Sequence, residues 1–250
     1  MSAQGHMFGA GRTDSAKVLA EFEVDYTPVA VAVQLLLTLE RDLGPAPRIL
    51  DPSAGSGCWG RAARAVWPDC FLVGVEPRAT EADNLVAYDT GFSLTLERFI
   101  ECVRGPIDPF DLIVSNPPFD VAFTKDYWPG LLLDAGLVAP GGRVALYGRS
   151  QWGQSIEAAA NLRRWSPSWQ RRLCGRPAHR ADGRTDSCEY SFWGWDIEDL
   201  SLARSRPRPE WCCEQLPELP TKMRRWDPSA VPGTYPIEPA LVDEIRRRYL

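Results

Sequence analysis

A glycine-rich turn and one acidic residue point to a site for a ligand that carries a ribose. The turn spans 51–57 (Asp-Pro-Ser-Ala-Gly-Ser-Gly), between an apolar run and a segment with helical spacing. Glycines let a ligand approach the backbone closely, and a helix N-terminus offers amide groups to an anion. Glu76 ends the next apolar run, where its carboxylate could accept hydrogen bonds from ribose hydroxyls. NAD-binding folds use a similar turn, and a turn that serves only the fold is the other alternative.

The segment Asn116-Pro117-Pro118-Phe119 has a more specific pattern and follows another short apolar run. Its two prolines fix the backbone and remove two N–H donors, which leaves the nearby carbonyl groups facing outward. An aromatic amine is a poor nucleophile because its lone pair is delocalised into the ring. The Asn116 side-chain carbonyl and a neighbouring backbone carbonyl could hold both amine hydrogens and orient that lone pair, while Phe119 stacks on a flat base. The plain alternative is a proline turn that ends a strand.

Apolar runs alternate with helical patterns through the first 150 residues. The patterns predict strands at 48–51, 71–75, 93–97, 111–115 and 143–147, and helices at 58–66, 79–88 and 127–137. This alternation predicts a parallel sheet with helices on both faces. Such sheets bind ligands at the carboxyl ends of their strands. Asp51, Glu76 and Asn116 all occupy such ends, which supports a functional role for them.

In this order the motifs resemble those of class I S-adenosylmethionine (SAM)-dependent amino-methyltransferases, in particular the N6-adenine DNA methyltransferases. The resemblance covers roughly residues 24–150 and continues more loosely to about 196. Tyr26-Thr27-Pro28 is a shortened match to the segment that covers the cofactor, and 51–57 is similar to the SAM-binding turn. The resemblance implies an α/β fold: a Rossmann-like, doubly wound, mostly parallel sheet of seven strands.

The resemblance also implies a role for each matched residue. Catalysis falls to Asn116, Pro117, Pro118 and Phe119, with no metal. Contacts to SAM fall to Tyr26, Thr27, Pro28, Asp51, Ser53, Ala54, Gly55, Gly57, Glu76, Pro77, Phe99 and Asn116. The family usually places an acid just before the Phe that follows the third strand, where it contacts the adenine of the cofactor. Arg98 stands there in this chain, so Glu97 or the backbone near Phe99 is left for that contact.

An arginine-rich segment predicts contact with nucleic acid. The chain has a net charge of −5, yet residues 163–184 hold seven arginines and one acid. Trp165 and Trp169 interleave with them, as on surfaces that meet phosphates and stack bases. The alternative is a solvated loop whose tryptophans pack on the core. The expected nucleic-acid contacts are Arg163, Arg164, Arg171, Arg172, Arg176 and Arg180.

The sequence divides into a methyltransferase-like domain at 1–204 and a proline-rich C-terminal extension at 205–250 that ends in a short helix. Within the first part, 150–187 is the expected substrate-facing insertion, followed by an aromatic-rich strand at 187–195. The seven cysteines form no C-x-x-C pair, so we expect reduced thiols and no metal site. No signal peptide and no membrane span are expected, which makes a cytoplasmic protein the default. The oligomeric state is left open.

The leading hypothesis is methyl transfer from SAM to adenine N6 in DNA. The same chemistry on an RNA base, on cytosine N4 or on a protein glutamine is the first alternative. A second is an inactive SAM-fold protein that only binds nucleic acid or a partner, and it predicts SAM binding without methyl transfer. A dinucleotide oxidoreductase ranks last, because Asn-Pro-Pro-Phe has no role in hydride transfer.

Overall fold

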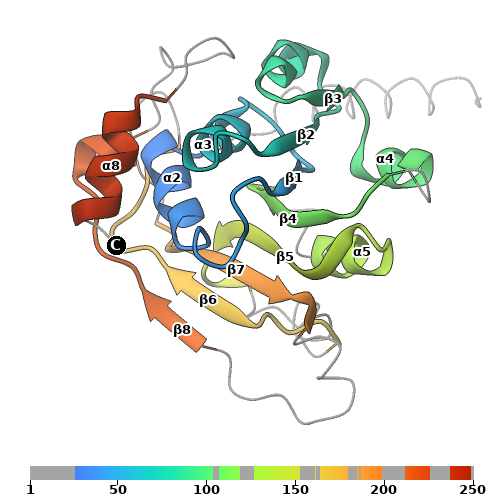
Figure 1. Ribbon diagram of the computed structural model, residues 1–250. Coiled ribbons are helices and arrows are strands. Elements are labelled where there is room, and N and C mark those ends of the chain that lie inside the picture. Colours follow the sequence, from blue (N-terminus) through green and yellow to red (C-terminus); the bar gives the residue numbers. More distant parts are fainter. Residues whose placement is uncertain are drawn as a thin grey trace, which may run out of the picture.

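A single twisted sheet organises the part of the chain that the structure describes (Figure 1). This computed structural model describes residues 26–103, 107–118, 127–152, 161, 164–179, 185, 187–198, 212–225 and 237–248. Over these residues the sheet has eight strands in the order β3-β2-β1-β4-β5-β7-β6-β8. The strands are β1 (Arg48–Asp51), β2 (Phe71–Val75), β3 (Thr90–Phe92), β4 (Phe110–Ser115), β5 (Val138–Arg149), β6 (Trp169–Arg172), β7 (Tyr190–Asp196) and β8 (Cys212–Gln215).

All strands of this sheet except β7 run in one direction. β1 pairs in parallel with β2 and β4, β2 with β3, and β4 with β5. β7 is antiparallel to β5 and β6, and β6 is parallel to β8. The predicted mostly parallel α/β sheet is therefore confirmed, with β8 as a strand beyond the seven expected. The carboxyl ends of β1, β2, β4 and β6 consequently lie along the same edge.

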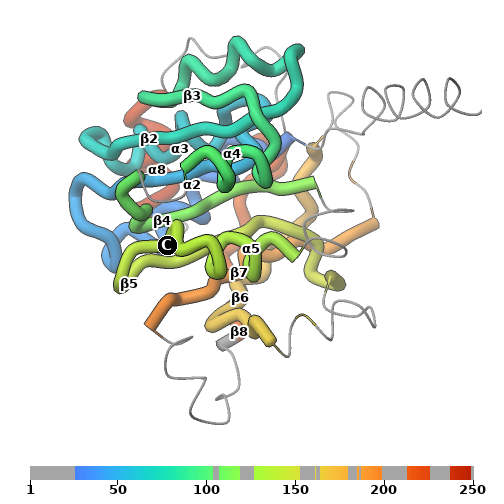
Figure 2. The backbone as a smooth tube through the Cα atoms, turned by 90° about the vertical axis from the view of Figure 1, so that its right-hand side faces the viewer, coloured from blue at the N-terminus to red at the C-terminus, as the bar shows by residue number. Residues whose placement is uncertain are grey.

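Helices cover both faces of the sheet, which makes it doubly wound (Figures 1 and 2). Side chains alternate between the faces because a strand has a period of two. In β4, Leu112 and Val114 join the core under α2 (Val29–Leu37), α3 (Cys58–Val66) and α8 (Pro239–Arg248). Ile113 joins the other core, under α4 (Leu96–Val103) and α5 (Trp128–Asp134). A 3₁₀ helix, η1 (Ala79–Ala87), connects β2 to β3.

The third strand was predicted in the wrong place. Residues 93–97 were expected to form it, but β3 is Thr90–Phe92 and the chain enters α4 at Leu96. The buried residues of α4 are Leu96, Phe99, Ile100 and Val103, a spacing of three and four that belongs to a helix. The strand interpretation ignored this longer period.

The C-terminal residues that the structure describes pack on the same sheet. β8 lies along β6, and Leu216 joins the core of α2 and α3. The Gln34 side chain of α2 donates to the Pro217 carbonyl at 2.8 Å. α8 lies against α2, where Arg246 pairs with Glu40 at 2.7 Å. The described parts of 205–250 therefore share the core of the preceding residues.

Trp165 and Trp169 belong to the core, so the expectation that they stack nucleic-acid bases is wrong. Their exposed fractions are 8% and 9%. The Trp165 carbonyl accepts hydrogen bonds from the Tyr127 hydroxyl and the Trp195 indole. The Trp169 ring lies directly over Gly194 of β7. Burial of two large aromatic rings stabilises the fold, which explains why both lie in the core and not on the surface.

The close approach of Trp169 to β7 gives a stability test. A Cβ on Gly194 would lie 1.9 Å from Trp169 Cε2, so Gly194→Ala must displace the buried ring. We expect a loss of about 1–3 kcal/mol of unfolding free energy, typical of an overpacked core. Urea denaturation measures it, with Gly44→Ala as the matched control because no atom lies within 4 Å of that Cβ. Equal stability of the two variants would mean that Trp169 does not pack on Gly194.

Candidate active site

The predicted site residues Asp51, Glu76 and Asn116 converge at the carboxyl edge of the sheet. Asp51 ends β1 and Glu76 follows β2, while Asn116 follows β4, the neighbour of β1 on its other side. The Ser115 hydroxyl at the end of β4 donates to Asp51 Oδ1 at 2.7 Å. The glycine-rich loop and the Asn-Pro-Pro segment are thus tied together by a direct bond.

Asp51 is buried and engaged by three donors from three segments. Besides Ser115, the backbone N–H of Ser53 donates to Oδ1 at 3.2 Å and the Tyr88 hydroxyl donates to Oδ2 at 2.6 Å. Burial raises the pKa of Asp51 to about 6, although these hydrogen bonds oppose the rise. Its carboxylate therefore holds the site together and has its acceptors directed into the protein.

The raised pKa of Asp51 predicts a pH-dependent stability. A carboxyl group with a folded-state pKa of about 6 and an ordinary value of 3.8 adds stability that is complete below 3.8 and is lost as the pH rises through 6. Relative to Asp51→Asn, the native protein should gain about 2 kcal/mol between pH 7 and pH 4. Urea denaturation of both proteins at several pH values tests this, and a pH-independent difference would contradict it.

The loop at 51–57 uses its amides inside the protein. Gly55 and Gly57 have φ of +49° and +72°, the left-handed region that favours glycine. The N–H groups of Ser53 and Gly55 donate to the carboxylates of Asp51 and Glu76, respectively. Those of Ala54 and Gly57 donate to the backbone carbonyls of Val75 and Ala54, respectively. These four N–H groups are therefore not available to a bound anion, contrary to the expectation from the sequence. At Gly55 the loop has no side chain of its own, and Arg78 and Tyr26 lie against this position.

Glu76 is 1% exposed and fully engaged by Arg78 and the loop. Oε1 accepts from the Arg78 backbone N–H at 3.0 Å and from Arg78 Nε at 2.7 Å. Oε2 accepts from the Gly55 N–H at 2.8 Å and from Arg78 Nη2 at 3.1 Å. Burial opposes the charge on Arg78, but the bonds to Glu76 outweigh it and raise the pKa of the guanidinium.

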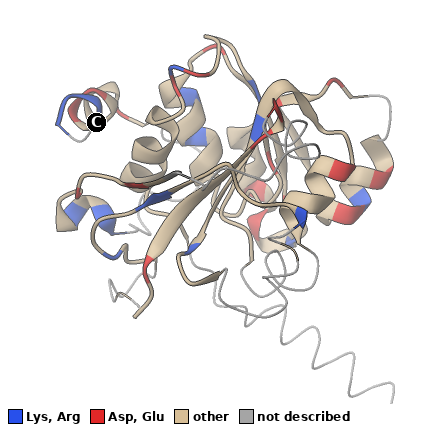
Figure 3. Ribbon diagram, turned by 90° about the horizontal axis from the view of Figure 1, so that it is seen from below, with Lys and Arg blue, Asp and Glu red and all other residues tan. Residues whose placement is uncertain are grey.

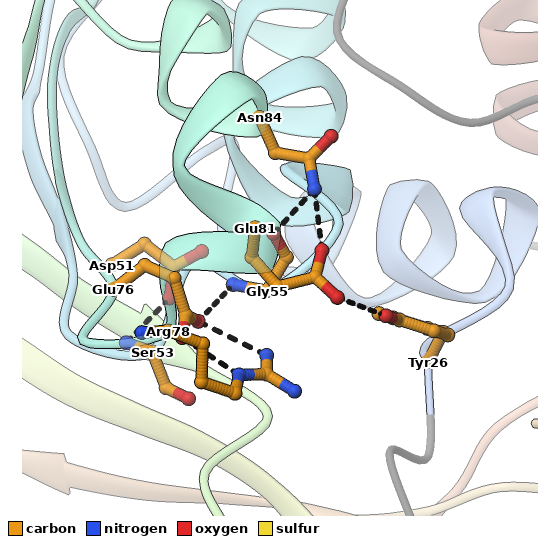
Figure 4. Close-up of polar contacts among 8 residues, drawn as sticks. All are labelled: Tyr26, Asp51, Ser53, Gly55, Glu76, Arg78, Glu81 and Asn84. Carbon is orange, nitrogen blue, oxygen red and sulfur yellow. Dashed lines mark hydrogen bonds and ion pairs between the residues drawn. The ribbon is translucent and has the colours of Figure 1, made fainter. Parts of the chain in front are cut away.

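Tyr26 closes the loop from the other end of the site (Figure 4). Its hydroxyl donates to Glu81 of η1, and burial together with this bond raises the pKa of the phenol. The Asn84 amide donates to the Gly55 carbonyl at 3.1 Å and to Glu81 at 2.5 Å. The segment expected to cover the cofactor thus lies beside Gly55.

His179 anchors this covering segment to the sheet. The Tyr26 N–H donates to the His179 carbonyl at 3.3 Å, and His179 Nδ1 lies 3.0 Å from the Tyr26 carbonyl oxygen. His179 Nε2 is 3.2 Å from the hydroxyl of Tyr147 on β5. Thr27 and Pro28 follow, both buried, and α2 begins at Val29.

The remaining predicted residues are placed as follows. Asn116 is half-buried, Pro117 is buried and Pro118 is exposed. Pro77 is exposed beside Glu76. The Phe99 side chain is fully buried against Phe92, with ring centroids 5.2 Å apart, so any cofactor contact here falls to the backbone. Outside the described residues lie Phe119, Arg163 and Arg180.

Acidic partners from distant segments neutralise part of the arginine cluster. Arg171 pairs with Glu214 at 3.2 Å and donates to Thr38 at 3.0 Å, and its side chain is largely buried. Arg172 pairs with Glu189 at 2.5 Å and is 44% exposed. Basic and acidic segments lie interspersed in Figure 3. The local excess of charge in the sequence is therefore smaller in space.

The fold also separates the arginines from one another. Arg164 precedes β6 and pairs with Asp134 at the end of α5 at 3.5 Å. Arg172 ends β6, which runs in the same direction as β4, so Arg172 and the exposed Arg176 lie toward the edge that carries Asn116. Of the four described members, Arg172 and Arg176 are the two best placed to meet a polymer at the site.

Metal-binding clusters and membrane-spanning helices are both absent from the described residues. They contain no group of three or more His, Cys, Asp or Glu arranged to hold a metal ion. None of the helices within them has the length and apolar character needed to span a bilayer.

Reasoning from the sequence missed the residues that complete the site: Arg78, Glu81, Asn84, Tyr88 and His179. Arg78 could have been found by asking what compensates a carboxylate at the end of a buried strand. Glu81 and Asn84 are spaced by three residues in the predicted helix 79–88, a spacing that places both on one face. Tyr88 and His179 gave no local signal, because their partners are distant in the sequence.

Comparison with known proteins places the fold. No protein-family model matches the chain, and none of the curated proteins does. One similar structure is the modification subunit of a candidate type I restriction enzyme from Vibrio vulnificus YJ016, with a TM-score of 0.55 and 18% identity over 96% of this chain. This chain covers 55% of the Vibrio protein. A candidate class I SAM-dependent methyltransferase from Listeria monocytogenes has a TM-score of 0.51 and 14% identity over 90% of this chain and 70% of its own. At these identities the likeness shows a shared fold.

Proposed function

We propose that this chain transfers a methyl group from SAM to an exocyclic amino nitrogen, with adenine N6 in DNA as the acceptor. One observation carries the proposal: Asn116-Pro117-Pro118 leaves β4 directly after Ser115, whose hydroxyl is bonded to Asp51 of the glycine-rich loop at 2.7 Å. An acceptor held at Asn116 therefore lies next to the place where a loop-bound cofactor would be.

The residues around the loop fit SAM. Gly55 has no side chain that would block a ligand, Glu76 carries the carboxylate for ribose hydroxyls although Arg78 binds it in this structure, and Tyr26 covers the loop. SAM supplies a methyl group already activated by its sulfonium. The protein then needs neither a metal nor a covalent nucleophile, and its task is to position the acceptor.

Asn116 would position the amine. Its side-chain carbonyl and the Pro117 carbonyl accept the two amine hydrogens, which orients the lone pair toward the methyl group. Phe119 would stack on the base. Adenine within a duplex must leave the base stack to reach this position.

DNA is favoured over protein as the acceptor by two features. The fold is similar to that of the Vibrio protein described as the modification subunit of a candidate type I restriction enzyme, and we take this description as support for DNA. Arg172 and the exposed Arg176 lie toward the edge with Asn116 and suit phosphate groups. RNA bases and cytosine N4 share the same chemistry and become outcomes of the test.

The direct test is an assay with tritiated-methyl SAM and the purified protein. Unmethylated DNA, RNA and a protein extract are offered in parallel, and the labelled products are digested and separated. Label in N6-methyladenine from DNA is the expected result. Label in RNA or protein would keep the chemistry and replace the acceptor. SAM binding without label in any polymer would favour an inactive nucleic-acid-binding protein.

Asn116→Ala separates catalysis from cofactor binding. We expect methyl transfer to fall by about 100-fold or more because the amine loses its orientation. SAM affinity, measured by calorimetry, should stay within about threefold, because the assigned role of Asn116 is to hold the acceptor. A parallel loss of SAM affinity would show that Asn116 holds the cofactor instead.

Charge reversal tests the arginines at the catalytic edge. Arg172→Glu with Arg176→Glu should weaken DNA binding and reduce the slope of log K against log [salt] by about two, because two phosphate contacts are lost. Fluorescence anisotropy at several salt concentrations measures both. Arg164→Glu is the matched control and should change DNA binding less. An equal effect of the control would mean that Arg172 and Arg176 do not form a specific DNA contact at this edge of the sheet.

A further inference from the structure

The part of the loop that faces a cofactor is covered by side chains of this chain. A Cβ built on Gly55 would lie 3.7 Å from Arg78 Nη2 and 4.0 Å from Tyr26 Cε1. Figure 4 shows Arg78 folded back onto Glu76 and Tyr26, from the segment before α2, reaching Glu81. The backbone that glycine leaves open is therefore occupied from within.

Arg78 also takes up the acceptor capacity of Glu76. A carboxylate offers about four lone-pair directions. Two are used by the backbone N–H groups of Gly55 and Arg78, at 2.8 and 3.0 Å. The other two are used by Nε and Nη2 of the Arg78 guanidinium, at 2.7 and 3.1 Å. The backbone donors are fixed by the loop, so the guanidinium is the group that can be exchanged.

We propose that Arg78 is an internal competitor of the cofactor: its guanidinium holds the acceptor sites on Glu76 that the ribose hydroxyls require, and cofactor binding displaces it. This inference rests on the proposed function. The side chain of Arg78 is 25% exposed and can move into solvent, whereas that of Glu76 is 1% exposed and needs a compensating group. The guanidinium meets that need until a ribose replaces it. We call the state with Arg78 on Glu76 closed and the state without this contact open. Only open molecules bind the cofactor, so the apparent affinity is the intrinsic affinity multiplied by the fraction of open molecules.

Arg78→Met tests the competition, because it removes the guanidinium and keeps a long apolar side chain. If Arg78 is closed about nine-tenths of the time, both SAM and its neutral product S-adenosylhomocysteine should bind about tenfold more tightly to the variant. Titration calorimetry with both ligands measures this. Unchanged binding would overturn the proposal, since Arg78 would then have no effect on the cofactor. Weaker binding would overturn it as well, since Arg78 would then be a cofactor ligand. A gain in affinity for SAM alone would also overturn it. Such a gain would mean that removing the positive charge of Arg78 only reduces its repulsion of the positively charged SAM.

Two further variants control for folding and charge. Arg78→Lys keeps the charge but loses the paired donors of the guanidinium, so we expect a smaller gain in affinity than with Met. Arg246→Met removes an arginine of α8 that pairs with Glu40, which follows α2, and it should leave the affinity for both ligands unchanged. The melting temperature of Arg78→Met should be lower without ligand and should rise more on adding S-adenosylhomocysteine. An equal rise in the native protein would count against competition.

The outcomes separate this inference from the function on which it rests. If the native protein binds the cofactor and Arg78→Met gains nothing, the internal competitor is wrong and the proposed function stands. If neither the native protein nor Arg78→Met binds SAM or S-adenosylhomocysteine, both the internal competitor and the proposed function are wrong. Binding by Arg78→Met alone would support both.

Discussion

The Asp51 carboxylate is the interaction on which the candidate site depends. A buried carboxylate is unfavourable unless donors surround it, and here the donors come from the loop after β1, from Tyr88 at the end of η1 and from the end of β4. Each segment is placed by a different part of the sheet. Their meeting at one group fixes the distance between the loop and Asn116 more firmly than strand pairing would. The residue that begins the glycine-rich motif thus has a structural role.

The sheet itself was predictable wherever strands are buried on both faces. The run 71–75 is apolar throughout and 48–51 has an apolar centre in Ile49 and Leu50, and the structure places β2 and β1 at these bounds. β6 and β8 could not be recognised in this way. Their sequences, Trp-Gln-Arg-Arg and Cys-Cys-Glu-Gln, are short and polar because they lie at or near the edge of the sheet. Their pairing partners are also distant in the sequence.

The site was predictable in outline because its residues follow strands that the pattern reveals. Asp51, Glu76 and Asn116 were placed at one edge by topology alone, and Tyr26 was found beside Gly55. What each carboxylate binds could not be predicted, because the donors are distant in sequence or contribute only a backbone N–H. The ion pairs of the arginine cluster could not be predicted for the same reason. Glu214, which lies 43 residues after Arg171, decides how much of its charge remains.

The pairing of α2 with α8 ties the first described helix to the last. α2 is almost entirely buried, and part of its cover comes from α8 and from Pro217, through contacts that span 206 and 183 residues of chain. Contacts of such long range form late in folding. During synthesis, the apolar side of α2 stays without this cover until α8 has left the ribosome. The segment before α2 carries Tyr26, so the cover of the site becomes complete only when α8 has docked on α2.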